Sequence, residues 1–294
     1  MNNLFIVIAL LYAALTSTSV AESNSTTTGC AGLKTGDKIA FLGDSITAQG
    51  FDNAGGYVWL VISGLESLGL KVTPIPAGVS GHTSKDMLVR LSKDVIAKKP
   101  DWVTISCGVN DVWHGAMGVE LAAYKANLKA MVNQCQAAGI RVMLLTATMI
   151  GEDQSNANNQ KLVAYNEAVR ILAQEKKCLL ADLNARMQVA VKSPERSDLV
   201  DQGKKLTVDG VHMNYFGNEM MAEGVLIAFG FTDDQLKIAR NKWADLANTM
   251  NLGTMAVSYR EYKALEAAAA KRKQSVKGMV DAAVAKTLAD LSKD

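Results

Sequence analysis

Residues 38–47 carry the sequence Lys-Ile-Ala-Phe-Leu-Gly-Asp-Ser-Ile-Thr, in which an apolar run ends in glycine, aspartate and serine. Apolar positions in this run do not alternate with polar ones, a pattern typical of a strand buried on both faces of a parallel sheet. Counting this first segment, Lys38–Leu42, the sequence predicts five strands, and the others are Lys71–Ile75, Trp102–Cys107, Arg141–Ala147 and Cys178–Leu183.

Helical patterns fill the stretches between these strands, near Tyr57–Leu68, Ser84–Lys98, Val119–Ala138 and Asn158–Lys176. Fully apolar strands separated by single helices indicate a parallel sheet that is covered on both faces. The crossovers are expected to be right-handed, which favours a doubly wound arrangement. The sequence therefore predicts the α/β class, as a three-layer α/β/α sandwich with a five-stranded parallel sheet.

The first 34 residues differ from the rest of the chain. An apolar run, Leu4–Leu15, precedes the small-x-small site Ser19–Ala21. This pattern predicts a signal peptide over residues 1–21 and an exported protein, either periplasmic or secreted. The run is short for a membrane span, although a retained N-terminal anchor stays an alternative. Residues 22–34 are rich in Ser and Thr and predict a flexible linker.

The character of the chain changes again near its C-terminal end. We expect one main domain over residues 35–250 and a helical extension over residues 251–294, in which no strand is expected. Apolar residues of the extension fall on one side of a helix, at Val276, Val280, Val284, Leu288 and Leu291. This stripe indicates either a helix docked on its own domain, or self-association or a partner contact through the C-terminal helices.

The net charge of the chain indicates which classes of binding partner to expect. The formal net charge of +2 gives no strong field, so neither nucleic acid nor a stable membrane partner is expected. Export would permit disulfide bonds, and Cys135, late in a predicted helix, could lie near Cys178, at a strand start. Spacing alone leaves that bond open.

Four polar segments follow predicted strands, namely Gly43–Thr47, Gly78–Thr83, Gly108–Asp111 and Asp209–His212. The first three come directly after the first three strands, and the fourth follows the last strand and a polar loop. Functional groups of an open parallel sheet gather at the carboxyl ends of its strands. We therefore expect these segments to meet at one edge of the sheet.

The residue types in these segments suit acyl transfer. Ser45 offers a hydroxyl at the start of a helix or loop, where backbone amides can stabilise an anion. Asp209 stands three residues before His212 and can accept from one ring nitrogen, which leaves the other to take a serine proton. A glycine N–H of the segment Gly78–Thr83 and the Asn110 side chain are uncharged donors suited to an oxyanion.

In combination the four segments resemble the blocks of the SGNH (GDSL-type) hydrolase family, over about Lys38–Phe229. The resemblance implies a flavodoxin-like sandwich with Ser-His-Asp esterase chemistry. Matching motif positions implies the nucleophile Ser45, the base His212 and its orienting partner Asp209. The implied oxyanion hole consists of the Ser45 amide, the Gly81 amide and the Asn110 side chain. Gly81 is preferred to Gly78 because the family's donor precedes an x-Thr/Ser step.

Two departures accompany the resemblance. Many family members carry asparagine at the end of the second strand, where this chain has Pro76-Ala77-Gly78, and we expect this to affect loop geometry. No Gly-x-Ser-x-Gly occurs, which argues against the ordinary α/β-hydrolase fold.

Asp44 and Asp111 are expected to shape their own loops. Three residues beside the oxyanion segments are predicted to line the substrate site: His82, Trp113 and His114.

The resulting prediction is an exported serine esterase that works through an acyl-enzyme and needs neither metal nor cofactor. The resemblance implies removal of O-acetyl groups from a carbohydrate, with a small-molecule or polysaccharide ester as substrate. A lysophospholipase or thioesterase of the same family is the alternative. Two other classes of function are alternatives. One is a metal-dependent hydrolase that uses His82, His114 and His212, and the other is a non-catalytic carbohydrate-binding module.

Overall fold

The computed structural model describes residues 31–192, 204–246, 250–252 and 255–291. The predicted signal peptide and residues 22–30 of the predicted linker lie outside the described residues. Leu33, at the end of that linker, is 7% exposed and packs into the core. The Gly32 carbonyl accepts a hydrogen bond of 2.8 Å from Arg141 Nη1. The folded part of the chain therefore already includes residues 31–34.

Five parallel strands form the central sheet, in the order β2-β1-β3-β4-β5. The bounds are β1 Lys38–Gly43, β2 Thr73–Gly78, β3 Trp102–Ser106, β4 Arg141–Leu145 and β5 Leu179–Ala181. In the register, Ile39 of β1 lies between Pro74 and Trp102. All of Ile39–Leu42 is fully buried, as expected for a central parallel strand. This strand order is that of flavodoxin-like folds, and the predicted fold class is confirmed.

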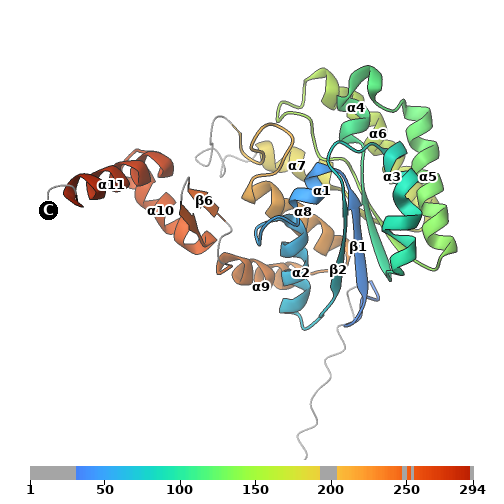
Figure 1. The fold of residues 1–294 in the computed structure, drawn as a ribbon, viewed down its shortest axis with the longest axis horizontal. Helices are drawn as coiled ribbons and strands as arrows, with labels where there is room; N and C mark the ends of the chain where they lie inside the picture. Colours follow the sequence, from blue (N-terminus) through green and yellow to red (C-terminus); the bar gives the residue numbers. More distant parts are fainter. Residues whose placement is uncertain (1–30, 193–203, 247–249, 253–254, 292–294) are drawn as a thin grey trace, which may run out of the picture.

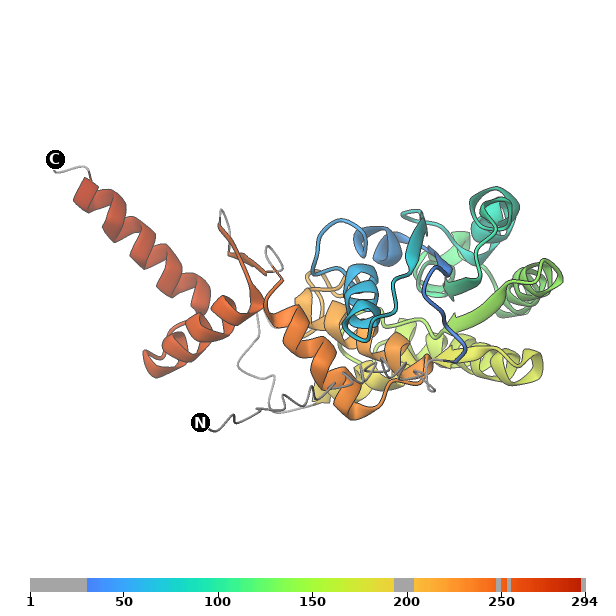
Figure 2. The same cartoon turned by 90° about the horizontal axis from the view of Figure 1, so that it is seen from below.

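Helices cover both faces of the sheet, as Figures 1 and 2 show. One face carries α2 (Tyr57–Ser67), α7 (Leu183–Lys192), α8 (Tyr215–Ala228) and α9 (Asp233–Ala244). The other face carries α3 (Ser84–Asp94), α5 (Leu121–Ala137) and α6 (Ala157–Lys176). Two short helices follow the carboxyl ends of β1 and β3 directly: α1 (Ser45–Gln49) and α4 (Val109–Trp113). The 3-10 turns are η1 (Ile96–Lys98) and η2 (Gly115–Met117).

The second strand runs further than its sequence indicated. The sequence predicted a strand over Lys71–Ile75, whereas β2 spans Thr73–Gly78 and includes both Pro74 and Pro76. Proline cannot donate to a ladder, so it is tolerated mainly on edge strands. Because β2 is an edge strand with β1 as its one neighbour, Pro74 and Pro76 fit there. Pro76 and Ala77 are thus strand residues. The difference in loop geometry that we expected relative to other family members therefore concerns only the residues after Gly78.

Two further predictions were wrong in detail. The last strand ends at Ala181, and the following residues, expected as polar loop, form α7. The C-terminal extension does contain strands, since β6 (Met250–Leu252) pairs antiparallel with β7 (Met255–Val257). The strands β5, β6 and β7 have three residues each, so their hydrophobic pattern covers too few residues to be distinctive.

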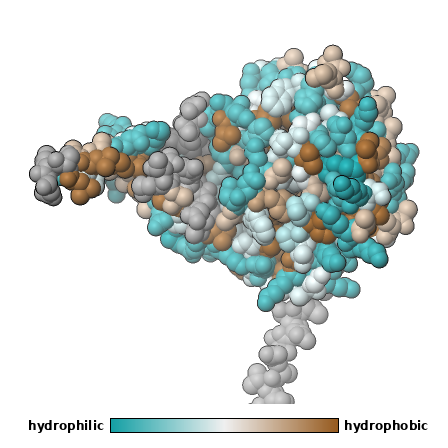
Figure 3. Space-filling view, in the orientation of Figure 1, coloured by the Kyte–Doolittle hydropathy of each residue, from teal (hydrophilic) through white to brown (hydrophobic). Residues whose placement is uncertain are grey.

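The extension ends in two helices, α10 (Tyr259–Lys271) and α11 (Val276–Leu291). Tyr259 stacks on Tyr215 of α8, with ring centroids 4.7 Å apart, and so attaches α10 to the main domain. The α11 helix points away from the sandwich in Figures 1 and 2. Hydrophobic surface lies along it in Figure 3. No helix in the described part of the chain is long and apolar enough to cross a membrane.

Cys135 and Cys178 are both free thiols, so the disulfide that the sequence left open is not formed in this structure. Burial raises the pKa of the Cys135 thiol to about 12 and that of Cys178 to about 11. Neither thiol therefore carries appreciable thiolate near neutral pH, and thiolate is the reactive form.

Candidate active site

Ser45 is the first residue of α1, directly after the carboxyl end of β1. Asp44 caps this helix, because its Oδ1 accepts a hydrogen bond of 2.9 Å from the Ile46 N–H. On the inner side, Thr47 Oγ1 and the Tyr57 hydroxyl are 3.0 Å apart. The predicted role of Asp44 in shaping the serine loop agrees with this geometry. The Ser45 N–H, at a helix start, has no intrahelical partner.

A continuous hydrogen-bonded chain links the three predicted catalytic side chains. Ser45 Oγ lies 2.8 Å from His212 Nε2. His212 Nδ1 lies 2.6 Å from Asp209 Oδ2. The other Asp209 oxygen accepts from the backbone N–H groups of Val211 and His212, at 2.9 Å and 2.8 Å. The carboxylate therefore holds both the ring and the backbone of the histidine, which leaves Nε2 directed at the serine.

The two aspartates of the site are in contrasting environments. Partial burial raises the pKa of Asp209, but hydrogen bonds from the His212 ring and from two backbone N–H groups outweigh it and hold the pKa at about 2. Burial raises the pKa of Asp44 to about 6, although the Ile46 N–H and nearby His212 lower it. Asp209 is therefore ionised at neutral pH, whereas Asp44 is a buried carboxyl close to its titration point.

The predicted oxyanion donors follow β2 and β3: Gly81 lies on the loop after β2, and Asn110 lies at the start of α4, after β3. Gly81 has a φ of +79°, which favours glycine, and a side chain there would meet no atom within 4 Å. Gly78 is instead pressed against α1, where an added Cβ would lie 2.4 Å from the Ala48 nitrogen. Asn110 is 4% exposed, and its Nδ2 donates to the His82 carbonyl at 3.1 Å, which leaves one amide hydrogen for another acceptor.

Asp111 acts over a longer range than its sequence indicated. Rather than only holding its own turn, its carboxylate accepts from both the Ser84 N–H, at 3.0 Å, and the Ser84 hydroxyl. Burial raises the pKa of Asp111, against the bonds from Ser84 that lower it. Asp111 thus joins α4, which carries Asn110, to the start of α3.

Sequence reasoning missed Glu152, which follows β4. Its carboxylate accepts hydrogen bonds from the backbone N–H groups of Lys205, Leu206 and Thr207, at 2.7 Å, 2.8 Å and 2.9 Å. The Thr207 hydroxyl donates to it as well, at 2.8 Å. These residues lead into the segment that carries Asp209. No local pattern marks Glu152, because its partners lie more than 50 residues later in the chain.

The predicted substrate residues surround the oxyanion loops. His82 follows Gly81 and is partly buried, Trp113 ends α4 and is 46% exposed, and His114 comes next. Within the described residues, no hydrogen bond joins Trp113 or His114 to the Ser45–His212 pair. Their part in substrate binding stays a prediction.

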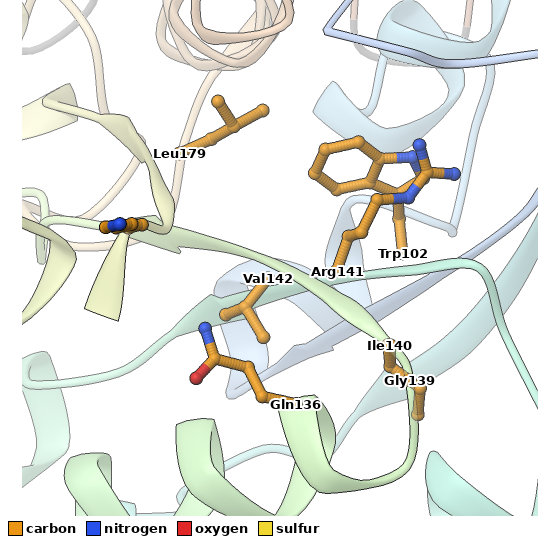
Figure 4. A pocket seen from close by; sticks show the side chains of 8 residues that line it. Trp102, Gln136, Gly139, Ile140, Arg141, Val142 and Leu179 are labelled. Carbon is orange, nitrogen blue, oxygen red and sulfur yellow. The ribbon is translucent and has the colours of Figure 1, made fainter.

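A separate pocket of about 360 Å³ lies at the opposite, amino-terminal edge of the sheet. In Figure 4 the Arg141 side chain lies against Trp102, and its guanidinium carbon is 4.3 Å from the indole centroid. None of the predicted catalytic residues lines this pocket. Among the described residues, no group of three or more His, Cys, Asp or Glu side chains is arranged to hold a metal ion.

Comparisons with known proteins assign this chain to a family of ester hydrolases. Residues 41–220 match the model of the GDSL-like Lipase/Acylhydrolase family, which is more than half of the chain. The chain belongs to this family. It is accordingly an SGNH hydrolase, and its enzyme class is that of the serine carboxylic ester hydrolases.

This SGNH hydrolase is similar to an acetylxylan esterase of Geobacillus stearothermophilus, with 30% identity over 67% of this chain and 95% of the relative. It also resembles the crystal structure of the acetyl xylan esterase AlAXEase, with a TM-score of 0.60 and 32% identity over 65% of this chain and 98% of the other. An uncharacterized lipoprotein of Bacillus subtilis, YqeF, is 25% identical over 71% of this chain and 93% of its own length.

Proposed function

We propose that this SGNH hydrolase removes O-acetyl groups from a carbohydrate through an acyl-enzyme on Ser45. The observation that carries the mechanism is the 2.8 Å contact between Ser45 Oγ and His212 Nε2, continued to Asp209. A serine hydroxyl is a weak nucleophile until an adjacent base takes its proton, and the base works best when a third group orients it.

In the first half of the reaction, Ser45 Oγ attacks the acetyl carbonyl carbon while its proton moves to His212 Nε2. The imidazolium that forms is stabilised by Asp209, whose low pKa keeps it anionic. The tetrahedral oxyanion then collapses, the bond to the alcohol oxygen breaks, and the alcohol leaves with the proton from His212.

In the second half, water attacks the acetyl-enzyme and gives its proton to His212. Collapse of the second tetrahedral species breaks the bond to Ser45 Oγ, which recovers the proton, and acetate is released. In both halves the oxyanion would be stabilised by the Ser45 and Gly81 N–H groups and by the free amide hydrogen of Asn110. Such fixed donors stabilise the transition state because they need no reorganisation during the reaction.

The carbohydrate substrate is supported by the relatives. Two acetylxylan esterases align with about two thirds of this chain and with nearly their entire own length. The exposed indole of Trp113, close to the Asn110 donor, offers an apolar face of the kind that packs against sugar rings. Acetylated xylo-oligosaccharides are therefore the first substrates to test.

Acetate release from acetylated xylo-oligosaccharides by the purified protein tests the substrate class. The protein would be compared with its Ser45→Ala variant and assayed in parallel on p-nitrophenyl acetate, butyrate and octanoate. We expect Ser45-dependent acetate release and a preference for the acetyl ester. Fastest turnover of octanoate, without acetate release from the oligosaccharides, would replace the proposal with lipid acyl hydrolysis.

We also propose that the protein is exported. The apolar run Leu4–Leu15 with the small residues at Ser19–Ala21 supports this, as does the similarity to a lipoprotein. Cell fractionation with N-terminal sequencing of the mature protein tests it. A mature chain that begins near residue 22 is expected, and an unprocessed cytoplasmic chain would contradict it.

A further inference from the structure

Arg90 of α3 is a buried cation beneath the candidate site, with a side chain that is 10% exposed. Its guanidinium Nη2 donates to the Gly43 carbonyl and its Nη1 to the Ala77 carbonyl, both at 2.8 Å. Nη1 also pairs with Asp94 one turn later, at 3.2 Å. A charged helix residue usually faces solvent, so this burial calls for a physical reason.

The two carbonyl contacts join the ends of adjacent strands. Gly43 ends β1 two residues before Ser45, and Ala77 is four residues before Gly81 in the loop after β2. The planar fork of the guanidinium fixes both carbonyls relative to one rigid group. The distance between the nucleophile and an oxyanion donor governs transition-state stabilisation, and a displacement of about 1 Å can cost roughly a hundredfold in rate.

A fourth contact of Arg90 determines the tautomer of His82. Arg90 Nε donates to His82 Nδ1 at 3.0 Å, so Nδ1 acts as an acceptor and carries no hydrogen. A neutral imidazole then carries its hydrogen on Nε2, and the partner of one ring nitrogen fixes the role of the other. No group among the described residues accepts from His82 Nε2.

His82 is connected to both predicted donor loops. It follows Gly81 directly, and its carbonyl accepts from Asn110 Nδ2 at 3.1 Å. Arg90 therefore contacts the end of β1 that precedes the nucleophile and the end of β2 that leads to the Gly81 loop. Through His82 it is also connected to the Asn110 amide.

We propose that Arg90 is a positioning residue that fixes the oxyanion loop relative to Ser45 and holds His82 in the Nε2–H tautomer, as a donor available to an oxygen of the bound ester. This inference rests on the proposed esterase function for its kinetic consequences. Its structural part, the His82 tautomer, is independent of activity.

The tautomer is tested first by long-range ¹H–¹⁵N NMR of the histidine rings. The full sequence has three histidines, and spectra of His82→Gln and His114→Gln variants assign them. In the wild-type protein we expect the pattern of an Nε2–H imidazole for His82. An Nδ1–H pattern, or a mixture of tautomers, would overturn the inference without any variant of Arg90.

Kinetics of Arg90→Lys test the positioning role, because lysine keeps the charge but lacks the fork that reaches two carbonyls and a ring nitrogen. We expect kcat for p-nitrophenyl acetate to fall roughly 10- to 100-fold with KM little changed, together with loss of the fixed His82 tautomer. Asp94→Asn is the matched control, since it removes the partly exposed ion-pair partner and leaves the other contacts in place, and it should keep wild-type kcat.

A double-mutant cycle separates positioning from general stabilisation. If Arg90 acts partly through His82, Arg90→Lys should cost less in a His82→Ala background than in the wild-type background. Additive losses, or wild-type kcat in a folded Arg90→Lys protein, would overturn the inference and leave the esterase function standing. A wild-type protein without Ser45-dependent activity would refute the function instead, and the tautomer measurement would still apply.

Discussion

Ser45 and His212 are 167 residues apart in the sequence, yet their side chains form a direct hydrogen bond. The histidine is held from behind by Asp209, which bonds both its ring and its backbone N–H. The sequence indicated this set because an aspartate three residues before a histidine can fold back on it. The structure adds the contact to Ser45, which no local pattern could establish.

Replacing Asp209 by asparagine tests the orienting role. Asparagine keeps a similar shape but has no negative charge to stabilise the imidazolium, and it can favour the wrong histidine tautomer. We expect kcat for p-nitrophenyl acetate to fall about 10³-fold or more, with little change in KM and in the midpoint of thermal unfolding. A variant that retains near wild-type kcat would show that Asp209 does not orient the base.

Asp44 gives the stability of the protein a specific pH dependence. Its folded-state pKa of about 6 lies above the ordinary value of 3.8, so the folded chain binds this proton more tightly than the unfolded chain does. The resulting contribution to the free energy of unfolding is present below pH 3.8 and is lost as the pH rises through 6. A shift of this size corresponds to about 3 kcal/mol in all, roughly half of it lost above pH 5.

Urea unfolding of wild type and Asp44→Asn at pH 5 and pH 8 measures this effect. Asparagine keeps an oxygen for the Ile46 N–H and does not ionise. Between these two pH values, the wild-type free energy of unfolding should therefore fall relative to that of the variant. A parallel pH dependence in both proteins would contradict the assignment of the buried titration to Asp44.

At the scale of helices and strands, the sequence was informative where the pattern was long. The largely apolar strands β1, β3 and β4, which helices separate along the chain, sufficed to predict the parallel sheet. Because parallel strands end at one edge, the convergence of Ser45, Asn110 and His212 followed from the strand assignment. The edge strand β2 was predicted over Lys71–Ile75 and in fact spans Thr73–Gly78, where its two prolines are tolerated because the strand lies at the edge of the sheet.

Residues whose roles depend on tertiary contacts were not predicted. Arg90 occupies an ordinary helical position, and only packing of α3 against the ends of β1 and β2 buries its guanidinium. Glu152 meets N–H groups that lie more than 50 residues later. Neither contact leaves a trace in local composition, hydrophobic period or motif spacing, and both support the predicted site from outside its four segments.

The Glu152 carboxylate is expected to control the loop that leads to Asp209. In Glu152→Gln, one acceptor oxygen becomes an NH₂ group that faces backbone N–H donors, so at least one hydrogen bond to a charged group is lost. We expect destabilisation by about 2–3 kcal/mol and a lower kcat. Urea unfolding and steady-state kinetics measure the two effects.

Glu175→Gln is the matched control for this change. Glu175 lies exposed on α6, and no hydrogen bond or ion pair to its side chain is found among the described residues. It should behave as wild type in both assays. Equal effects of the two substitutions would remove the special role assigned to Glu152.

At the scale of the whole molecule, α11 projects away from the catalytic fold, as Figures 1 and 2 show. The family match ends at residue 220, and α11 shows apolar side chains to solvent: Val284, Leu288 and Leu291 are 40%, 62% and 66% exposed. Contiguous apolar surface of this kind usually marks an interaction site. Self-association through this helix therefore stays a prediction.

Removal of residues 276–294 tests that prediction. Because α11 packs on α10 and is otherwise exposed, the shortened chain should keep wild-type kcat and KM. Light scattering after gel filtration should show a larger particle for the full mature chain than for the shortened one. Monomers in both samples would contradict self-association and leave catalysis unaffected.

Trapping of the acyl-enzyme tests whether Ser45 is the nucleophile. The purified protein would be mixed with p-nitrophenyl acetate, quenched in acid during the first turnovers, and analysed by peptide mass spectrometry beside its Ser45→Ala variant. We expect one acetyl group on the peptide that contains Ser45 in the wild-type protein, together with loss of hydrolysis in the variant. Undiminished hydrolysis by Ser45→Ala, or acetyl transfer to another residue during turnover, would contradict it.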